Sequence, residues 1–175
     1  MMRKGVIIAI IVILVLIGVF TVVNFLPLGP KKIVISMREY KFSIEGIGTV
    51  LNLKAGEKIV LDIRNDGVIV HELMIVRDKD EVVSLAEKVI EDLRMKYGDD
   101  VEAIEMGFEE WHEELHHDRP DLVLVSIDLE PGESSILEFT FDEPGTYWFI
   151  CLEIDATFPE THAHNGMILK IVVSG

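Results

Sequence analysis

The stretch 143–173 constrains the fold of this chain most, because it places soft metal ligands between two apolar runs. An aromatic run at residues 147–150 leads into Cys151, the only cysteine of the chain, and a second apolar run covers residues 168–173. Both runs are typical of buried strands. The polar loop between them carries three further candidate ligands: His162, His164 and Met167. A thiolate, imidazoles and a thioether on one strand–loop–strand unit suit copper better than zinc, calcium or magnesium.

These residues resemble the C-terminal motif of the cupredoxins, or blue copper proteins, a family that includes plastocyanin and azurin. The family motif is P-G-T-Y-x-x-x-C, then a loop ending H-x-x-x-G-M or a close variant; this chain has PGTYWFIC and then HAHNGM. The family's upstream histidine follows an Asn-containing turn, and NDGVIVHELMIV at 65–76 fits that pattern. The resemblance covers about residues 32–77 and 121–173. It implies a Greek-key antiparallel β-sandwich, all-β in class, with one copper held by four residues: His71, Cys151, His162 and Met167.

The ligand loop leaves two candidates for the second imidazole. His162 stands five residues before Met167, as in plastocyanin-like loops, whereas His164 stands three before it, as in the dinuclear copper domain of cytochrome oxidase subunit II. That domain also has a C-x-E-x-C run, in which Asp155 here replaces the second cysteine. Because a dinuclear centre needs the bridging thiolate, we favour His162 and keep His164 as the alternative.

The loop between Cys151 and His162 is longer than in the family, which usually has only a few residues there. Ten residues separate the two ligands in this chain. Lengthening a flexible loop from about four to about ten residues costs only about 0.8 kcal/mol of closure entropy. Metal-site binding energies are around 10 kcal/mol. The longer loop is therefore compatible with a metal site.

An apolar segment at residues 5–26 is long enough to cross about 30 Å of hydrocarbon as a helix. A cleaved signal peptide normally has a shorter apolar core and small residues at its cleavage site, and the exit sequence NFLPLGP lacks them. We therefore expect residues 1–30 to be a retained single-pass transmembrane anchor and linker in the cell membrane. Basic residues flank the segment equally, so the family resemblance alone places the C-terminal domain outside the cytoplasm.

The remaining chain, residues 31–175, is long enough for one domain with its own core. The whole chain has 31 acidic and 16 basic residues, a formal charge of −15. Such a surface repels phosphate backbones, so nucleic acid is not an expected partner. An acidic surface can attract cations or steer a basic protein partner, and it is equally typical of a soluble acidic ectodomain.

Short apolar runs separated by turn residues predict strands at 33–37, 40–44, 50–53, 58–63, 68–76, 122–129 and 136–141. Between about residues 80 and 119 the hydrophobic period changes to about 3.6, which predicts an inserted pair of amphipathic helices. We expect the first helix to have Asp80 as its N-cap and Gly98 as its stop, and Pro120 to end the second. Because two amphipathic helices need an apolar surface to cover, we expect the pair over one end or edge of the sandwich.

The second predicted helix contains an H-E-x-x-H sequence at residues 112–116. In zinc proteases the two histidines bind the metal and the glutamate, here Glu113, acts as general base. We interpret the match as chance on a solvated acidic face, because the helix ends soon afterwards and glutamates crowd it. A secondary metal site that includes His117 is the intermediate interpretation.

The ligand set implies a membrane-anchored one-electron carrier rather than an enzyme, with redox proteins such as a membrane oxidase or reductase as partners. Asn65 and Glu72 are candidates for orienting the ligands. One alternative is a copper carrier that delivers copper to an oxidase, for which Met74 and His164 are available. The other is a copper-free interaction ectodomain, in which Cys151 is a small buried hydrophobic residue.

Overall fold

A computed structural model describes residues 29–155 and 158–175 of the chain. The expected transmembrane anchor falls on residues 1–28, which lie outside the described part. Among the described residues, no helix has the length and apolar content that a membrane crossing requires. The anchor therefore stays a prediction from the sequence.

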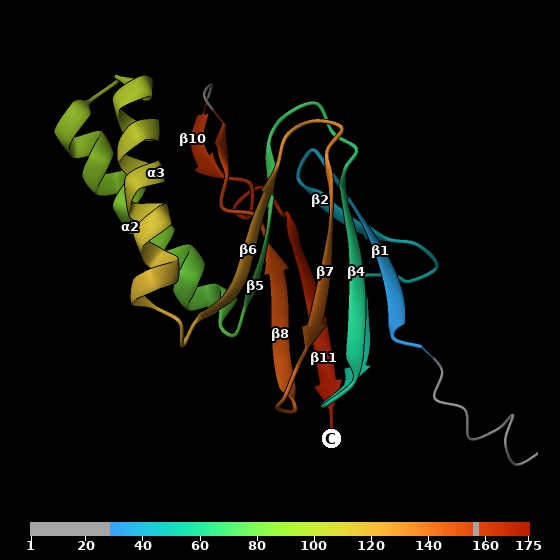
Figure 1. Cartoon of the computed structure of the whole chain (residues 1–175). Coiled ribbons are helices and arrows are strands. Elements are labelled where there is room, and N and C mark those ends of the chain that lie inside the picture. Colours follow the sequence, from blue (N-terminus) through green and yellow to red (C-terminus); the bar gives the residue numbers. More distant parts are fainter. Residues whose placement is uncertain (1–28, 156–157) are drawn as a thin grey trace, which may run out of the picture. The chain divides into compact units, whose positions relative to one another are not determined.

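The chain from residue 31 onward folds into two facing β-sheets with two helices on one side (Figure 1). The four-stranded sheet has the order β2 (Lys41–Ile44), β1 (Lys31–Arg38), β4 (Lys58–Asn65) and β7 (Ser134–Thr140). The five-stranded sheet has the order β3 (Val50–Lys54), β11 (Ile168–Ser174), β8 (Gly145–Ile150), β5 (His71–Val76) and β6 (Val123–Leu129). A small ribbon pairs β9 (Ile154–Asp155) with β10 (Phe158–Thr161). The predicted two-sheet arrangement is confirmed.

The predicted antiparallel β-sandwich is confirmed in part, because two of its strand pairs are parallel. β1 runs parallel to β4, and β11 runs parallel to β3. Parallel neighbours need a crossover connection rather than a tight hairpin. The segment containing β2 and β3 supplies it for β1 and β4, because β2 pairs beside β1 and β3 then joins the opposite sheet.

Strand β5 is buried along its whole length because an apolar layer covers each of its faces. Leu73 and Ile75 belong to the core between the sheets, whereas Met74 and Val76 belong to a second core under the helices. Because side chains alternate along a strand, His71 lies on the side of the first core and Glu72 on the helix side. The expected strand from residue 68 begins later, at His71.

Helices α2 (Lys79–Tyr97) and α3 (Val101–Asp118) form the inserted pair predicted between about residues 80 and 119. They pack on the outer face of the five-stranded sheet, near its β5–β6 side (Figure 1). Their buried apolar residues join side chains of β5 and β8 in the second core: Val82, Ala86, Ile90, Phe108 and Leu115. The change of period therefore identified both helices and their amphipathic character.

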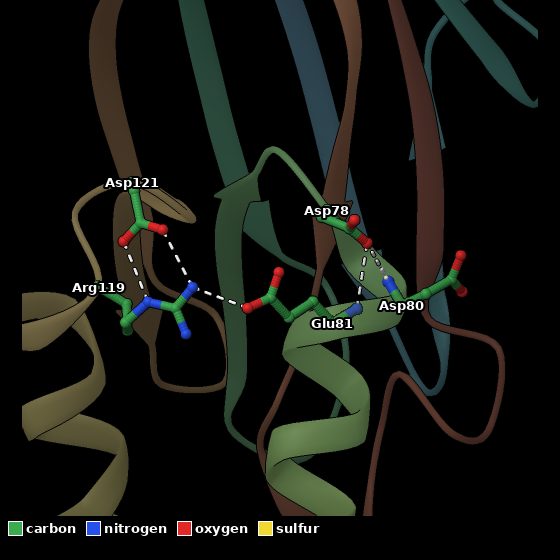
Figure 2. Close-up of polar contacts among 5 residues, drawn as sticks. All are labelled: Asp78, Asp80, Glu81, Arg119 and Asp121. Atoms are coloured by element: carbon green, nitrogen blue, oxygen red, sulfur yellow. Dashed lines mark hydrogen bonds and ion pairs between the residues drawn. The ribbon is translucent and has the colours of Figure 1, made fainter.

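Charged side chains join the start of α2 to the end of α3 (Figure 2). Asp78, and not the expected Asp80, caps α2, because its carboxylate accepts hydrogen bonds from the backbone N–H groups of residues 80 and 81. Arg119, just after α3, donates to Glu81 at 2.7 Å and to Asp121. The expected stop at Gly98 is confirmed by its φ of 64° and its N–H bond to the Arg94 carbonyl oxygen.

Candidate metal centre

Three buried side chains from distant parts of the chain converge at one end of the sandwich. The Nδ1 atoms of His71 and His162 are 3.2 Å apart, and the Cys151 Sγ is 3.3 Å from the His162 Nδ1. His71 and Cys151 are 0% exposed, and His162 is 1% exposed. Ligand bonds of about 2.0–2.3 Å in a trigonal or tetrahedral set separate donor atoms by roughly 3.3–3.8 Å. The three atoms are therefore spaced as ligands of one metal ion.

Sheet pairing brings His71 and Cys151 together. His71 is the first residue of β5, and Cys151 directly follows β8, its antiparallel neighbour. Cys151 continues the core-facing alternation of Tyr147 and Phe149, so its sulfur points between the sheets. The backbone N–H of Glu72 donates to the Cys151 sulfur at 3.3 Å. Glu72, a candidate for orienting the ligands, therefore contacts the Cys151 sulfur through its backbone.

The long ligand loop reaches the site because its backbone folds back on itself. The ribbon of β9 and β10 lies within it. The His162 N–H donates to the Glu153 carbonyl oxygen at 2.8 Å, and the Ala163 N–H donates to the Cys151 carbonyl oxygen at 2.7 Å. These bonds fix His162 over Cys151 despite the ten intervening residues.

Asn65 holds the turn that leads into His71. Its side-chain amide donates to the carbonyl oxygens of Ile69 and Leu129, each at 2.8 Å. Its side-chain oxygen accepts the backbone N–H of Gly67 at 2.9 Å. All these partners are backbone atoms, so Asn65 ties the turn to β6. Its expected orienting role agrees with these contacts.

The thiol of Cys151 keeps its proton in the metal-free protein, and a bound cation would favour its loss. Burial raises the pKa of Cys151 well above its usual value, and the nearby negative charge of Glu72 raises the pKa further. Burial likewise lowers the pKa of His71, so that its imidazole is held neutral. A neutral imidazole and a thiol that a metal ion can deprotonate are the forms that metal binding requires.

Of the two candidate histidines in the loop, the structure brings His162 to the cluster. His164 is half-exposed, and its Nδ1 lies 3.0 Å from the Glu87 carboxylate on α2. That hydrogen bond raises the pKa of His164. Met167 is fully buried in the same core as Cys151, and its backbone N–H donates to the His162 carbonyl oxygen at 3.0 Å.

Two residues that the sequence did not single out support the histidines. The Tyr40 ring meets the His162 ring edge-on, with centroids 5.2 Å apart. Tyr40 has a φ of 58°, the one left-handed non-glycine residue in the described part of the chain. A Cβ on Gly67 would come within 2.9 Å of the His71 Nε2 atom. The Asn-Asp-Gly turn was visible in the sequence, but no local signal places either residue against an imidazole.

The H-E-x-x-H run is not the solvated face that we expected from its sequence. The His112 and His116 side chains are 14% and 29% exposed, and both turn toward the fully buried carboxylate of Glu72. Burial lowers the pKa of His112, but the charge of Glu72 outweighs burial and raises the pKa to about 9. Glu113 and His117 are exposed. The solvated interpretation therefore holds for Glu113, Glu114 and His117 but not for His112 and His116.

A surface pocket of about 400 Å³ opens beside the first cluster. Of the three cluster residues, His162 lines it. Apolar residues such as Val68, which is 79% exposed, and carboxylates such as that of Glu130 line the pocket. A second molecule in this pocket would approach the cluster through the His162 ring.

The sequence matches no protein-family model, and the search of curated proteins finds no match either. Solved structures do match. A dithionite-reduced auracyanin from Roseiflexus castenholzii has a TM-score of 0.53 and 25% identity, covering 83% of this chain and 98% of its own. Auracyanin B has a TM-score of 0.53 and 22% identity, covering 86% and 94%.

Auracyanin A of Chloroflexus aurantiacus, described as a "blue" copper protein, has a TM-score of 0.53 and 20% identity, covering 83% of this chain and 100% of its own. These similarities establish a mostly β, two-sheet, cupredoxin-like fold that carries two helices in this chain. The His71, Cys151 and His162 cluster is consistent with copper binding.

Proposed function

We propose that this chain is a copper-binding one-electron transfer protein. The convergence of two imidazole nitrogens and one sulfur, 3.2 and 3.3 Å apart, carries the proposal. Two histidines and a cysteine in a trigonal arrangement, with a weak axial methionine, form the ligand set of blue-copper electron-transfer sites. The residues that would hold the copper are His71, Cys151 and His162, with Met167 as the proposed weaker fourth ligand.

The donor set fits copper better than the alternatives. A zinc site with a structural role normally has four protein ligands of cysteine and histidine, and calcium and magnesium prefer oxygen ligands. Here one buried sulfur and two buried imidazoles lie together beside an apolar core. Copper supplies the redox chemistry when bound, because it exchanges one electron between its two oxidation states.

The protein's part is to hold the donors still while an electron arrives or leaves. His71 is fixed by the Asn65 turn, and Cys151 by the N–H bond from Glu72. His162 is fixed by backbone bonds and by the Tyr40 ring. Because the protein holds these ligands in place, they would move little when copper changed its oxidation state, and the reorganisation energy of electron transfer would be small. The site therefore favours electron exchange over substrate turnover.

We propose that redox partners dock over the pocket beside His162. This ring is the cluster member that reaches the pocket, and the apolar Val68 provides an exposed contact there. Exposed apolar residues surrounded by polar groups are typical of protein contact sites. The partner class, redox proteins such as a membrane oxidase or reductase, and the extracytoplasmic placement rest on the cupredoxin resemblance. The tether at residues 1–30 rests on the apolar N-terminal sequence.

The contacts give less support to a copper carrier. Met74 lies in the core under the helices, on the other side of the sheet from Cys151. His164 pairs with Glu87 at the surface. The two side chains that a transfer route would use therefore face away from the cluster. A copper-free ectodomain has no need for three donor atoms to converge, so the cluster counts against that alternative too.

Titration of the full-length chain with Cu(II), followed by optical and electron paramagnetic resonance spectroscopy, tests the proposal. We expect one equivalent to bind and give an intense thiolate charge-transfer band, which Cys151→Ser abolishes. His164→Ala is the matched control in the same loop and should keep the band. A colourless complex in the wild-type chain, or loss of the band in the control alone, would overturn the assignment.

A further inference from the structure

A second group of ligand-type side chains lies on the opposite face of the same sheet. It consists of Glu72 from β5 and two residues of α3, His112 and His116. The His112 Nε2 is 3.2 Å from the Glu72 Oε1, and the His116 Nε2 is 3.9 Å from the same oxygen. One donor atom from each of the three residues lies within 4.8 Å of the other two. We call these three residues the outer cluster.

The spacing of the outer cluster fits a tetrahedral metal ion. Bonds of about 2.0–2.2 Å at tetrahedral angles separate the donor atoms by roughly 3.3–3.6 Å. The observed separations of 3.2 and 3.9 Å lie on either side of that range. Histidines four residues apart present their rings on one face of a helix, so both can reach one ion. Small shifts of two side chains would complete the site.

An ion pair between Glu72 and His112 explains only part of this arrangement. A buried carboxylate needs a positive partner, and one imidazolium is sufficient. The structure aims a second imidazole, that of His116, at the same oxygen. The His112 Nε2 is buried, and despite its closeness to Glu72 it has no partner in hydrogen-bond geometry among the described residues. An ion between the three side chains would give each of these nitrogens a partner.

The remaining contacts of Glu72 hold its carboxylate in place for such an ion. Its Oε2 accepts the backbone N–H of Leu152 at 3.1 Å, and its Oε1 accepts the hydroxyl of Ser126. Hydrogen bonds that orient a ligating carboxylate are a regular feature of metal sites. The oxygen nearest the two imidazoles belongs to a side chain that is 0% exposed. The carboxylate is therefore preorganised, whereas the helix supplies the adjustable ligands.

Access and charge also suit a cation. A pocket of about 150 Å³ reaches His112, and Glu109 and Glu153 line it. Strand pairing sets Asp128 directly opposite Glu72. A cation entering through the pocket would meet carboxylates and water before it reached the imidazoles. Three protein ligands leave a fourth position open for water from the pocket.

We propose that Glu72, His112 and His116 form a second metal site, specific for a zinc-type divalent transition metal and distinct from the copper cluster. Two imidazoles and one carboxylate are a donor set in which proteins hold zinc. The site joins α3 to β5, so a bound ion would fasten the helical pair to the strand that carries His71. The inference does not depend on copper binding, because none of the three ligands belongs to the first cluster.

The experiment uses the full-length chain with Cys151→Ser and His162→Gln, which removes two ligands of the first cluster. Zn²⁺ is titrated by calorimetry, and Co²⁺ replaces it so that visible d–d bands report the coordination. We expect one equivalent to bind and His116→Ala in this background to weaken binding roughly 100-fold. The exposed neighbour His117→Ala is the matched control and should bind as the background does. Circular dichroism of each variant verifies folding.

Two results would overturn the second site. One is a folded background that binds no Zn²⁺ equivalent, which leaves only an ion pair at Glu72. The other is equal weakening by His116→Ala and His117→Ala, which places the ion elsewhere on the acidic surface. The same His116 and His117 substitutions in the wild-type chain repeat the test should the double background not fold. There, a second Zn²⁺ equivalent should disappear with His116→Ala and persist with His117→Ala.

Discussion

The two faces of β5 present two different ligand clusters from adjacent residues. His71 faces the core between the sheets and meets a sulfur and an imidazole that are both fully buried. Glu72 faces α3 and meets two imidazoles that are 14% and 29% exposed, beside a pocket. The first cluster is drawn from strand ends and a loop, and the second from a strand and a helix. Alternation along a single strand therefore separates soft sulfur chemistry from harder carboxylate chemistry.

The two clusters also differ in what they contribute without a metal. In the outer cluster, the carboxylate of Glu72 is paired with His112 and the pKa of His112 is raised to about 9 by that charge, against the effect of burial. In the first cluster Cys151 and His71 are neutral, because burial raises the pKa of Cys151 and lowers the pKa of His71. We therefore expect the outer cluster to stabilise the metal-free fold and the first cluster to be tuned for its metal.

Removing Glu72 should have the largest effect on stability. Glu72→Ala leaves His112 without its charge partner and the Leu152 N–H without its acceptor. Loss of one side of a buried pair should lower the unfolding free energy of the metal-free protein by about 3 kcal/mol. Urea denaturation measures it. Glu113→Ala, on an exposed position of α3, is the control and should stay within about 0.5 kcal/mol. Equal values for the two variants would contradict a stabilising outer cluster.

Copper binding at the first cluster should depend on the shape of the turn that leads into His71. In Gly67→Ala the new methyl group would lie 2.9 Å from the His71 Nε2 atom and 2.8 Å from the Glu39 Oε1 atom. Displacement of an oriented ligand should weaken copper binding about tenfold. Competition with a chromogenic chelator measures the affinity. Gly48→Ala is the matched control, because a Cβ there meets nothing within 4 Å. Unchanged copper affinity in Gly67→Ala would show that the turn does not position His71.

The smallest effect on stability is expected from a substitution in the four-stranded sheet, which carries neither cluster. Hydrogen bonds from Arg64 and Lys32 lower the pKa of Asp62 from 3.8 to about 2. A lowered folded-state pKa gives stability that is complete above pH 4 and is lost as the pH falls through about 2. Because both partners are half-exposed, we expect about 1 kcal/mol.

Thermal unfolding of Asp62→Asn between pH 7 and pH 2 measures this contribution. The variant should lose the acid-dependent part of the stability curve and keep both metal affinities. Asp92→Asn, exposed on α2, is the control and should follow the wild-type curve. A change in metal affinity in Asp62→Asn would mean that the two sheets are coupled more tightly than the contacts indicate.

Much of this arrangement follows from local patterns in the sequence. The aromatic run at residues 147–150 predicted a buried strand that leads into Cys151, and the 3.6-residue period predicted both helices. The choice of His162 over His164 came from Asp155, which stands where a dinuclear copper domain has its second cysteine, and the cluster contains His162. The parallel pairing of β1 with β4 was missed, because apolar runs carry no sign of strand direction.

The amino-acid sequence by itself determined which residues can bind a metal, and it put His71 and Glu72 on opposite faces of their strand, because residue chemistry and side-chain period are local properties. Only the tertiary structure decided which of them meet. It set the H-E-x-x-H helix over Glu72 and placed Tyr40 against His162. Such contacts depend on how helices and loops settle on the sheet, which is decided by packing between residues far apart in the chain.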